Sequence, residues 1–257
     1  MKKAIIFDLD GTLWDTTVQV EKVWNEVAKN HNIDIRDKQI KDIMGLTKNE
    51  IIQYLFDDNI QLGEKFITEC QNKENEYLSK YGGRIYENTI KTIEMLNEKY
   101  NLYIVSNCQA GYIEAFLNYY DLKNYIKDFE SSGNTGKDKE FNIKEILERN
   151  NIKDAVYVGD TKKDYLASKS NNIKFIWAKY GFGICDCYDD YIEDILELTE
   201  KMKELYRYWK FNIYIAFTLY SMNIIIFVKI WKICLKYFIF LNICCIMQKE
   251  CSTLMVN

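Results

Sequence analysis

The chain has 257 residues, of which 48% are hydrophobic, 34 are Lys or Arg and 38 are Asp or Glu, giving a net charge of −4. This length is sufficient for one large domain or for a domain with an insert, and the hydrophobic content allows a sizeable buried core. The slight acidic excess argues against a nucleic-acid-binding protein, for which a basic surface is expected.

Apolar strands and amphipathic helices alternate along most of the chain. The predicted strands cover residues 3–8, 102–106, 126–130, 155–160 and 173–178. The predicted helices cover residues 87–100, 110–120, 140–150, 163–171 and 189–206. Such alternation is typical of the α/β class, in which helices cover both faces of a parallel sheet. We therefore expect a Rossmann-like parallel sheet core.

Residues 16–81 contain no predicted strand and lie between the first and second strands of the expected sheet. Apolar side chains recur in this stretch at helical spacing, and Gly45 and Gly63 are expected to divide it into several helices. This pattern indicates an inserted α-helical cap. The expected domains are a core of residues 1–15 and 82–206 and a cap of residues 16–81.

Residues 207–257 form an apolar C-terminal tail, because no Asp or Glu occurs from residue 207 to residue 249. Two apolar runs, at 211–228 and 230–247, are interrupted by lysines, and the first is 18 residues long. This length is near the lower limit for a transmembrane helix. Three interpretations stay open: membrane association through residues 211–247, a hairpin packed on the core, or an out-of-frame extension beyond the domain.

The cysteines and the N-terminus bear on the cellular compartment. The eight cysteines are scattered and none forms a CxxC pair, which indicates reduced thiols rather than a zinc knuckle. The apolar run at residues 3–8 is short and ends in an acid, as expected for a strand and not for a signal peptide. We expect a cytoplasmic protein, with membrane association through residues 211–247 as the alternative.

Two acidic motifs follow apolar strands. The motif FDLDGT has Asp8 and Asp10 two positions apart, so that alternation along a strand directs both to one face, and Gly11 allows a sharp turn. The motif VGDTKKD has Asp160 at a strand end and Asp164 four residues later. Ligands bind at the carboxyl ends of parallel strands. Four carboxylates meeting there need a divalent cation with oxygen ligands, and Mg²⁺ fits best.

Two other segments contain groups suited to a phosphoryl oxygen. Ser106 and Asn107 end the strand YIVSN, where a hydroxyl and the first amides of the following helix can donate hydrogen bonds. Lys137 follows a glycine in a loop before a helix, where its charge can offset that of a nucleophile and a phosphate. Lys139 is the competing candidate.

The order DxDGT, strand-end Ser, Lys and GDxxxD resembles the haloacid dehalogenase superfamily over residues 1–206. The helical insert resembles the small cap of the phosphoglycolate phosphatase-like branch. This resemblance implies a Mg²⁺-dependent phosphatase that hydrolyses a small phosphorylated metabolite, such as a phosphoglycolate-like phosphomonoester, with no nucleic-acid partner. The alternatives are a phosphosugar mutase of the same superfamily and a membrane-tethered, non-catalytic module.

The resemblance also implies a role for each site residue. Asp8 is expected to attack phosphorus and form an aspartyl-phosphate, and Asp10 to act as the general acid and base. The expected metal ligands are Asp8, the Asp10 backbone carbonyl, Asp160 and Asp164. The expected phosphate-binding groups are Ser106, Asn107 and Lys137. The cap residues expected to contact the substrate are Gly45, Leu46, Thr47 and Lys48.

Overall fold

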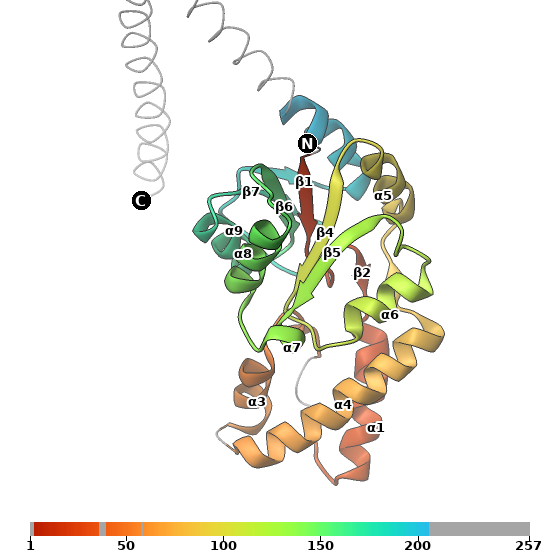
Figure 1. Ribbon diagram of the computed structural model, residues 1–257. Helices are drawn as coiled ribbons and strands as arrows, with labels where there is room; N and C mark the ends of the chain where they lie inside the picture. The colour runs from red at the N-terminus through yellow and green to blue at the C-terminus, as the bar shows by residue number, and fades with distance from the viewer. Residues whose placement is uncertain (1–2, 36–39, 58, 206–257) are drawn as a thin grey trace, which may run out of the picture. The chain divides into compact units, whose positions relative to one another are not determined.

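The computed structural model describes residues 3–35, 40–57 and 59–205 (Figure 1). The chain divides into two compact units, residues 1–200 and 201–257. Of the second unit only the helical residues 201–205 are described, so the predictions for the tail at 207–257 lie outside the described residues. Within the described ranges, no helix is long and apolar enough to cross a membrane.

A six-stranded parallel sheet forms the centre of the first unit, with strand order β5-β4-β1-β6-β7-β8. The strands are β1 (Ala4–Phe7), β4 (Asn101–Ser106), β5 (Ile126–Ser131), β6 (Ala155–Gly159), β7 (Lys174–Ala178) and β8 (Asp190–Ile192). Five of these strands coincide closely with the predicted ones, and the predicted α/β class with a parallel sheet is confirmed.

Helices cover both faces of the sheet, because the strands near its centre are apolar on both sides. Ala4 and Ile6 of β1 pack into one core cluster with Ile143 of α8 (Lys139–Arg149) and Ala167 of α9 (Lys162–Ser170). The intervening β1 residues are equally buried towards the opposite face, where α5 (Thr89–Asn97) contacts β4. Figure 1 shows α8 and α9 on one side of the sheet and α5 on the other.

The predicted helix at 189–206 is wrong over its first half. Residues 190–192 instead form the edge strand β8, which pairs in parallel with β7, and residues 195–197 form the short 3₁₀ helix η1 (Ile195–Glu197). Two acids hold this segment in a non-helical conformation: Asp189 accepts from the Phe175 amide of β7 at 2.7 Å, and Asp194 accepts locally from the Leu196 amide at 2.7 Å. Such side-chain bonds to the backbone compete with helix formation.

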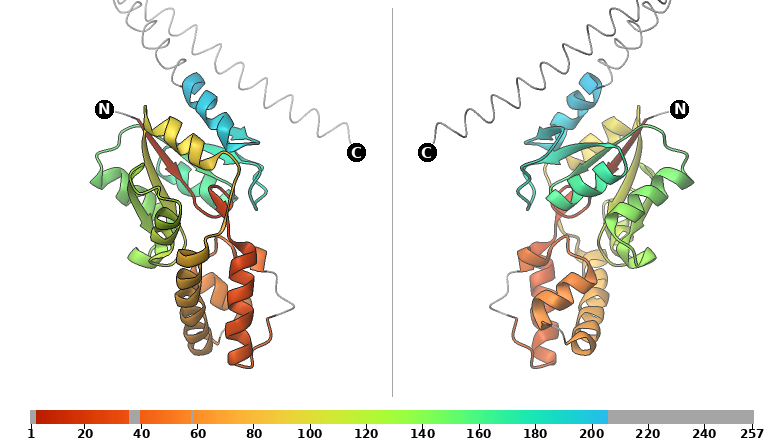
Figure 2. Two further views of the ribbon diagram at one scale, coloured as in Figure 1. Left: turned by 90° about the vertical axis from the view of Figure 1, so that its right-hand side faces the viewer. Right: turned by 90° about the vertical axis from the view of Figure 1, so that its left-hand side faces the viewer.

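The described residues of 17–81 form helices joined by turns and loops, in agreement with the predicted helical character of this stretch. They are α1 (Thr17–Asn30), α2 (Ile40–Ile43), α3 (Lys48–Phe56) and α4 (Ile60–Tyr81). α1 and α4 pack against each other (Figure 2), and the four helices share a core cluster separate from that of the sheet. The two-stranded antiparallel ladder of β2 (Trp14–Asp15) and β3 (Arg84–Ile85) joins the chain segments on either side of this block.

Gly45 and Gly63 behave differently in this block. Gly45 has φ +76° and separates α2 from α3, as expected. Gly63 was expected to end a helix, but it lies inside α4, which is a correction. A Cβ on Gly63 would lie 2.7 Å from Ile52 Cγ2 of α3, so the glycine allows close packing of the two helices.

Candidate active site

The first two acids of the site follow β1, the strand that lies between β4 and β6. Phe7 pairs with Val158 of β6, and the Asp8 amide donates to the Val158 carbonyl at 2.8 Å. This parallel register brings Asp8 and Asp160 to the same edge of the sheet, at its carboxyl end. Both side chains are buried, with exposed fractions of 2% and 0%.

Gly11 explains how the chain turns so close to the second acidic motif. Its φ is +79°, in the region that side-chain-bearing residues rarely adopt. A Cβ at this position would lie 2.3 Å from Asp160 Oδ2. The glycine of FDLDGT therefore provides both the turn and the space that Asp160 occupies.

Hydrogen bonds to the backbone hold the two acids that follow β6. The amides of Phe182 and Gly183 donate to Asp160 Oδ2 at 2.7 and 3.1 Å. Asp164 Oδ2 accepts from the amide and the hydroxyl of Thr161, at 2.9 and 2.7 Å, and this capping box begins α9. Asp160 Oδ1 is buried without a hydrogen-bond partner, so one of its oxygens is left for another ligand.

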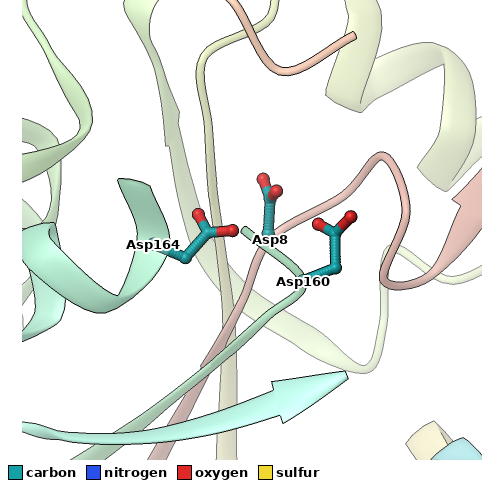
Figure 3. A group of neighbouring side chains, drawn as sticks. All are labelled: Asp8, Asp160 and Asp164. Atoms are coloured by element: carbon teal, nitrogen blue, oxygen red, sulfur yellow. The ribbon is translucent and has the colours of Figure 1, made fainter. Parts of the chain in front are cut away.

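Three buried carboxyl groups converge at this edge (Figure 3). One carboxylate oxygen from each of Asp8, Asp160 and Asp164 lies within 4.8 Å of the others. Burial raises the pKa of Asp8 to about 6, an effect that the charge of Lys139 opposes. Burial, together with the charges of Asp164 and Asp8, raises the pKa of Asp160 well above its usual value. The cluster could hold a metal ion, and its oxygen-only ligands suit a hard divalent cation.

Lys139 is the cation that the structure brings to this cluster. Its Nζ donates to Asp164 Oδ1 at 2.5 Å and lies 2.9 Å from Asp8 Oδ1. The second contact is an ion pair without hydrogen-bond geometry, since Asp8 Oδ1 has no hydrogen-bond partner. Burial lowers the pKa of Lys139, but the charges of Asp164 and Asp8 outweigh it and the pKa is raised. Lys139 is therefore protonated at neutral pH.

The structure brings Lys139, and not Lys137, to the acidic cluster, and the side chain of Lys137 is exposed. Asp138 caps α8 by accepting from the Phe141 amide at 2.9 Å, so the helix begins at Lys139. The backbone of Lys137 belongs to the preceding turn, where its amide donates to the Thr135 hydroxyl at 3.1 Å. The first helical residue, not the loop residue, faces the sheet edge.

Asp10 has a hydrogen-bonding environment separate from that of Asp8. Its Oδ1 accepts from the hydroxyls of Tyr112, at 2.9 Å, and of Thr16, at 3.1 Å. Tyr112 begins α6 (Tyr112–Tyr119). Burial, followed by the charge of Asp8, raises the pKa of Asp10 to about 8. At neutral pH this carboxyl group holds a proton while it stays beside Asp8.

Ser106 ends β4 at the same edge, Asn107 follows it directly, and both are buried. Asn107 Nδ2 donates to the Gly45 carbonyl at 3.1 Å, which ties the loop between α2 and α3 to the sheet. Gly45 and Leu46 line a pocket together with Asp10 and Ser106.

The other two cap residues named from the sequence have structural partners. The side chain of Thr47 caps α3 through a capping box with Glu50. Lys48 Nζ donates to the Thr68 hydroxyl at 3.0 Å. Neither residue lines the pocket that contains Asp10.

Glu74 is a pocket residue that sequence reasoning did not single out. It lies on α4 with an exposed fraction of 5%, and its Oε2 accepts from Trp24 Nε1 at 2.9 Å. Burial raises the pKa of Glu74 to about 7, against hydrogen bonds that lower it. A signal for it was present, because Glu74 continues the buried row Phe66, Cys70 and Leu78 at intervals of four residues.

Comparisons with known proteins agree with this architecture. The protein is of the α/β class, and the carboxyl edge of its parallel sheet carries buried acids and a lysine. Such a cluster can bind a divalent cation. Residues 5–178 match the family model of the haloacid dehalogenase-like hydrolases. The chain therefore belongs to this family of enzymes, and the family suggested by the order of its motifs is confirmed. No curated protein matches the chain.

Several solved structures share the fold. A predicted phosphatase from Clostridium acetobutylicum has 22% identity and a TM-score of 0.68, over 79% of this chain and 99% of that one. A predicted phosphoglycolate phosphatase from Haemophilus somnus has 18% identity and a TM-score of 0.67, over 78% and 98%. CbbY from Rhodobacter sphaeroides, solved with xylulose 1,5-bisphosphate, has 15% identity and a TM-score of 0.66, over 77% and 96%.

Proposed function

We propose that the chain is a phosphatase that hydrolyses a small phosphomonoester through an aspartyl-phosphate on Asp8. The observation that carries this proposal is the buried cluster of Asp8, Asp160 and Asp164, together with Lys139, at the carboxyl edge of the sheet. Family membership supports hydrolysis, and the similar solved structures described as phosphatases support a phosphate ester as the substrate.

A bound Mg²⁺ fits the residues that are present. The Asp160 Oδ1 atom has no hydrogen-bond partner and is available as a ligand, and Asp8, Asp164 and the Asp10 backbone carbonyl complete the proposed set. When bound, the ion supplies positive charge that reduces repulsion between an anionic phosphate and an anionic nucleophile. Lys139 contributes further positive charge from its buried position between Asp8 and Asp164.

The two acids of FDLDGT have different proposed roles because their environments differ. The Asp8 carboxylate attacks phosphorus, and the bond from phosphorus to the leaving oxygen breaks. Asp10 gives its proton to that oxygen, in keeping with a pKa of about 8. Asp10 then accepts a proton from water, whose oxygen attacks the phosphorus. Inorganic phosphate is released and Asp8 is restored as a carboxylate.

The phosphoryl oxygens are proposed to be bound by the Ser106 hydroxyl, the Asn107 amide and the Lys139 ammonium. These groups lie around the same edge, and phosphoryl transfer depends mainly on such positioning and charge stabilisation. We further propose that residues 16–81 act as a cap on a core of residues 1–15 and 82–206. The hydrogen bond from Asn107 to Gly45 supports contact between the cap loop and the sheet edge.

The experiment that tests this function compares Asp8→Asn with the purified wild-type protein on p-nitrophenyl phosphate in Mg²⁺. The variant is expected to lose at least about 1,000-fold in kcat, because an amide cannot act as the nucleophile. Asp121→Asn is the matched control: Asp121 is exposed and has φ +55°, a conformation that Asn tolerates. Turnover by Asp8→Asn close to the wild-type value would refute the proposal. Phosphate release from one ester alone distinguishes a hydrolase from a mutase.

A further inference from the structure

The pocket beside the proposed general acid is lined by acidic side chains and has no basic side chain among its described lining residues. It extends from Asp10 and Ser106 at the sheet edge to side chains of α1, α3 and α4. Its apolar wall includes Val20, Trp24 and Ile51, and its polar groups are Gln71, Glu74, Gln109 and Tyr112. Among the residues that the structure describes, no Lys, Arg or His lines this pocket.

The leaving group of the ester is expected to occupy this pocket. Asp10 must approach the leaving oxygen to protonate it, and Ser106 is proposed to contact the phosphoryl group, so the remainder of the alcohol extends away from both residues. The space in that direction leads to Glu74 on α4. The carboxyl group of Glu74 thus faces the part of the substrate that distinguishes one phosphate ester from another.

Glu74 is held in a defined orientation. Trp24 Nε1 donates to its Oε2 at 2.9 Å, and the side chain is 5% exposed. A buried carboxyl group requires hydrogen-bond donors, or a cation, for its oxygens. A hydroxyl group of the substrate can add a donor to those of Trp24 and Gln109, whereas a second carboxylate brings like charge without a counter-ion.

Resting on the phosphatase function above, we propose that Glu74 is a specificity-determining residue that selects an uncharged, hydroxyl-bearing leaving group. The substrate class is then a phosphate ester of a small polyol or sugar. Gln71 and Gln109 can both donate to and accept from its remaining hydroxyls. Esters whose leaving group carries a carboxylate are disfavoured, and phosphoglycolate belongs to this disfavoured class. Exclusion by an unpaired like charge is a recognised route to specificity.

The test uses two esters that differ at a single carbon: glycerol 3-phosphate, with a hydroxymethyl group, and 3-phosphoglycerate, with a carboxylate. For the wild-type protein in Mg²⁺ at pH 8, where Glu74 is ionised, kcat/KM is expected to be at least about tenfold higher for glycerol 3-phosphate. Glu74→Gln removes the carboxylate charge but has nearly the same side-chain shape. It is expected to lower the ratio of kcat/KM for glycerol 3-phosphate to kcat/KM for 3-phosphoglycerate by several-fold. Glu76→Gln is the matched control, because Glu76 lies on the same helix and is exposed. This control should leave the ratio unchanged.

The possible results separate this inference from the proposed phosphatase function. If p-nitrophenyl phosphate is hydrolysed but 3-phosphoglycerate is used as well as glycerol 3-phosphate, the role of Glu74 is refuted and the phosphatase function stands. If the wild-type protein hydrolyses none of the three esters, the phosphatase function itself is refuted. Should Glu74→Gln fail to fold, Gln71→Lys adds a cation to the same pocket and is expected to raise relative turnover of 3-phosphoglycerate. An unchanged ratio in Gln71→Lys would overturn the inference.

Discussion

Substitution of Glu74 by Gln is expected to make the protein more stable at pH 8 than the wild type, although it removes a group that a substrate would contact. Glu74 is buried on α4, and the charged form of a buried carboxyl group is costly. The amide of Gln has nearly the same shape and can still accept the hydrogen bond from Trp24 Nε1. The variant therefore removes the charge with little change in packing.

The size of the effect follows from the difference in proton affinity between the folded and unfolded chains. Burial raises the pKa of Glu74 from 4.5 to about 7. Below pH 4.5 the group is protonated in both states and contributes no pH dependence. Between these values the unfolded chain loses the proton first, so the free energy of unfolding falls as pH rises. Each pH unit corresponds to about 1.4 kcal/mol, so the loss is about 3 kcal/mol and is complete above about pH 7.

Urea denaturation of both proteins at a series of pH values from 4 to 8, without Mg²⁺, measures this difference. The free energy of unfolding of Glu74→Gln, relative to wild type, is expected to rise by about 3 kcal/mol across that range. Acids common to both proteins, including the active-site carboxylates, largely cancel in the comparison. Glu76→Gln serves as the exposed control on the same helix. A relative free energy that does not change with pH would show that Glu74 is not a buried acid with a raised pKa.

Lys139→Met is expected to lower kcat by at least about 100-fold, because it removes the buried cation beside Asp8. Lys137→Met should change kcat by less than about twofold in the same steady-state assay, since that side chain is exposed, and equal losses in the two variants would contradict the site geometry. Mg²⁺ at 100 times its dissociation constant is expected to add about 2.7 kcal/mol to the stability, which raises Tm by about 5–10 °C. Thermal unfolding of Asp160→Asn should show most of that increase lost, and a full increase in this variant would argue against the proposed ligand set.

The strands of the sheet were predictable because their residues are apolar on both faces. β1 and β6 are short, uninterrupted apolar runs with all of their residues buried. An Asp residue follows each strand directly. Sequence order alone therefore indicated which acids would meet at one edge. β8 was not predictable in the same way, because it contains Asp190 and is half polar. Its formation depends on pairing with β7 and on the hydrogen bond that the Phe175 amide of that strand donates to Asp189.

Two features of the site could not be predicted from the sequence alone: the position of Lys139, rather than Lys137, at the acidic cluster and the presence of Glu74 in the pocket. Both depend on contacts between elements that are distant in sequence. Lys137 and Lys139 are equivalent by local pattern, and the start of α8 decides between them. The spacing of Glu74 on α4 indicates a buried position, but it does not indicate what the side chain contacts. Only the packing of α4 near Trp24 and Asp10 makes it a pocket group. Local propensity cannot supply that information.

Asp164 belongs at once to a helix terminus and to the charged cluster. One oxygen closes the capping box that begins α9, while the other accepts a hydrogen bond from the ammonium group of Lys139. Any replacement here alters the stability of α9 and the electrostatics of the reaction together. The geometry of the acidic cluster and the start of α9 therefore depend on the same side chain.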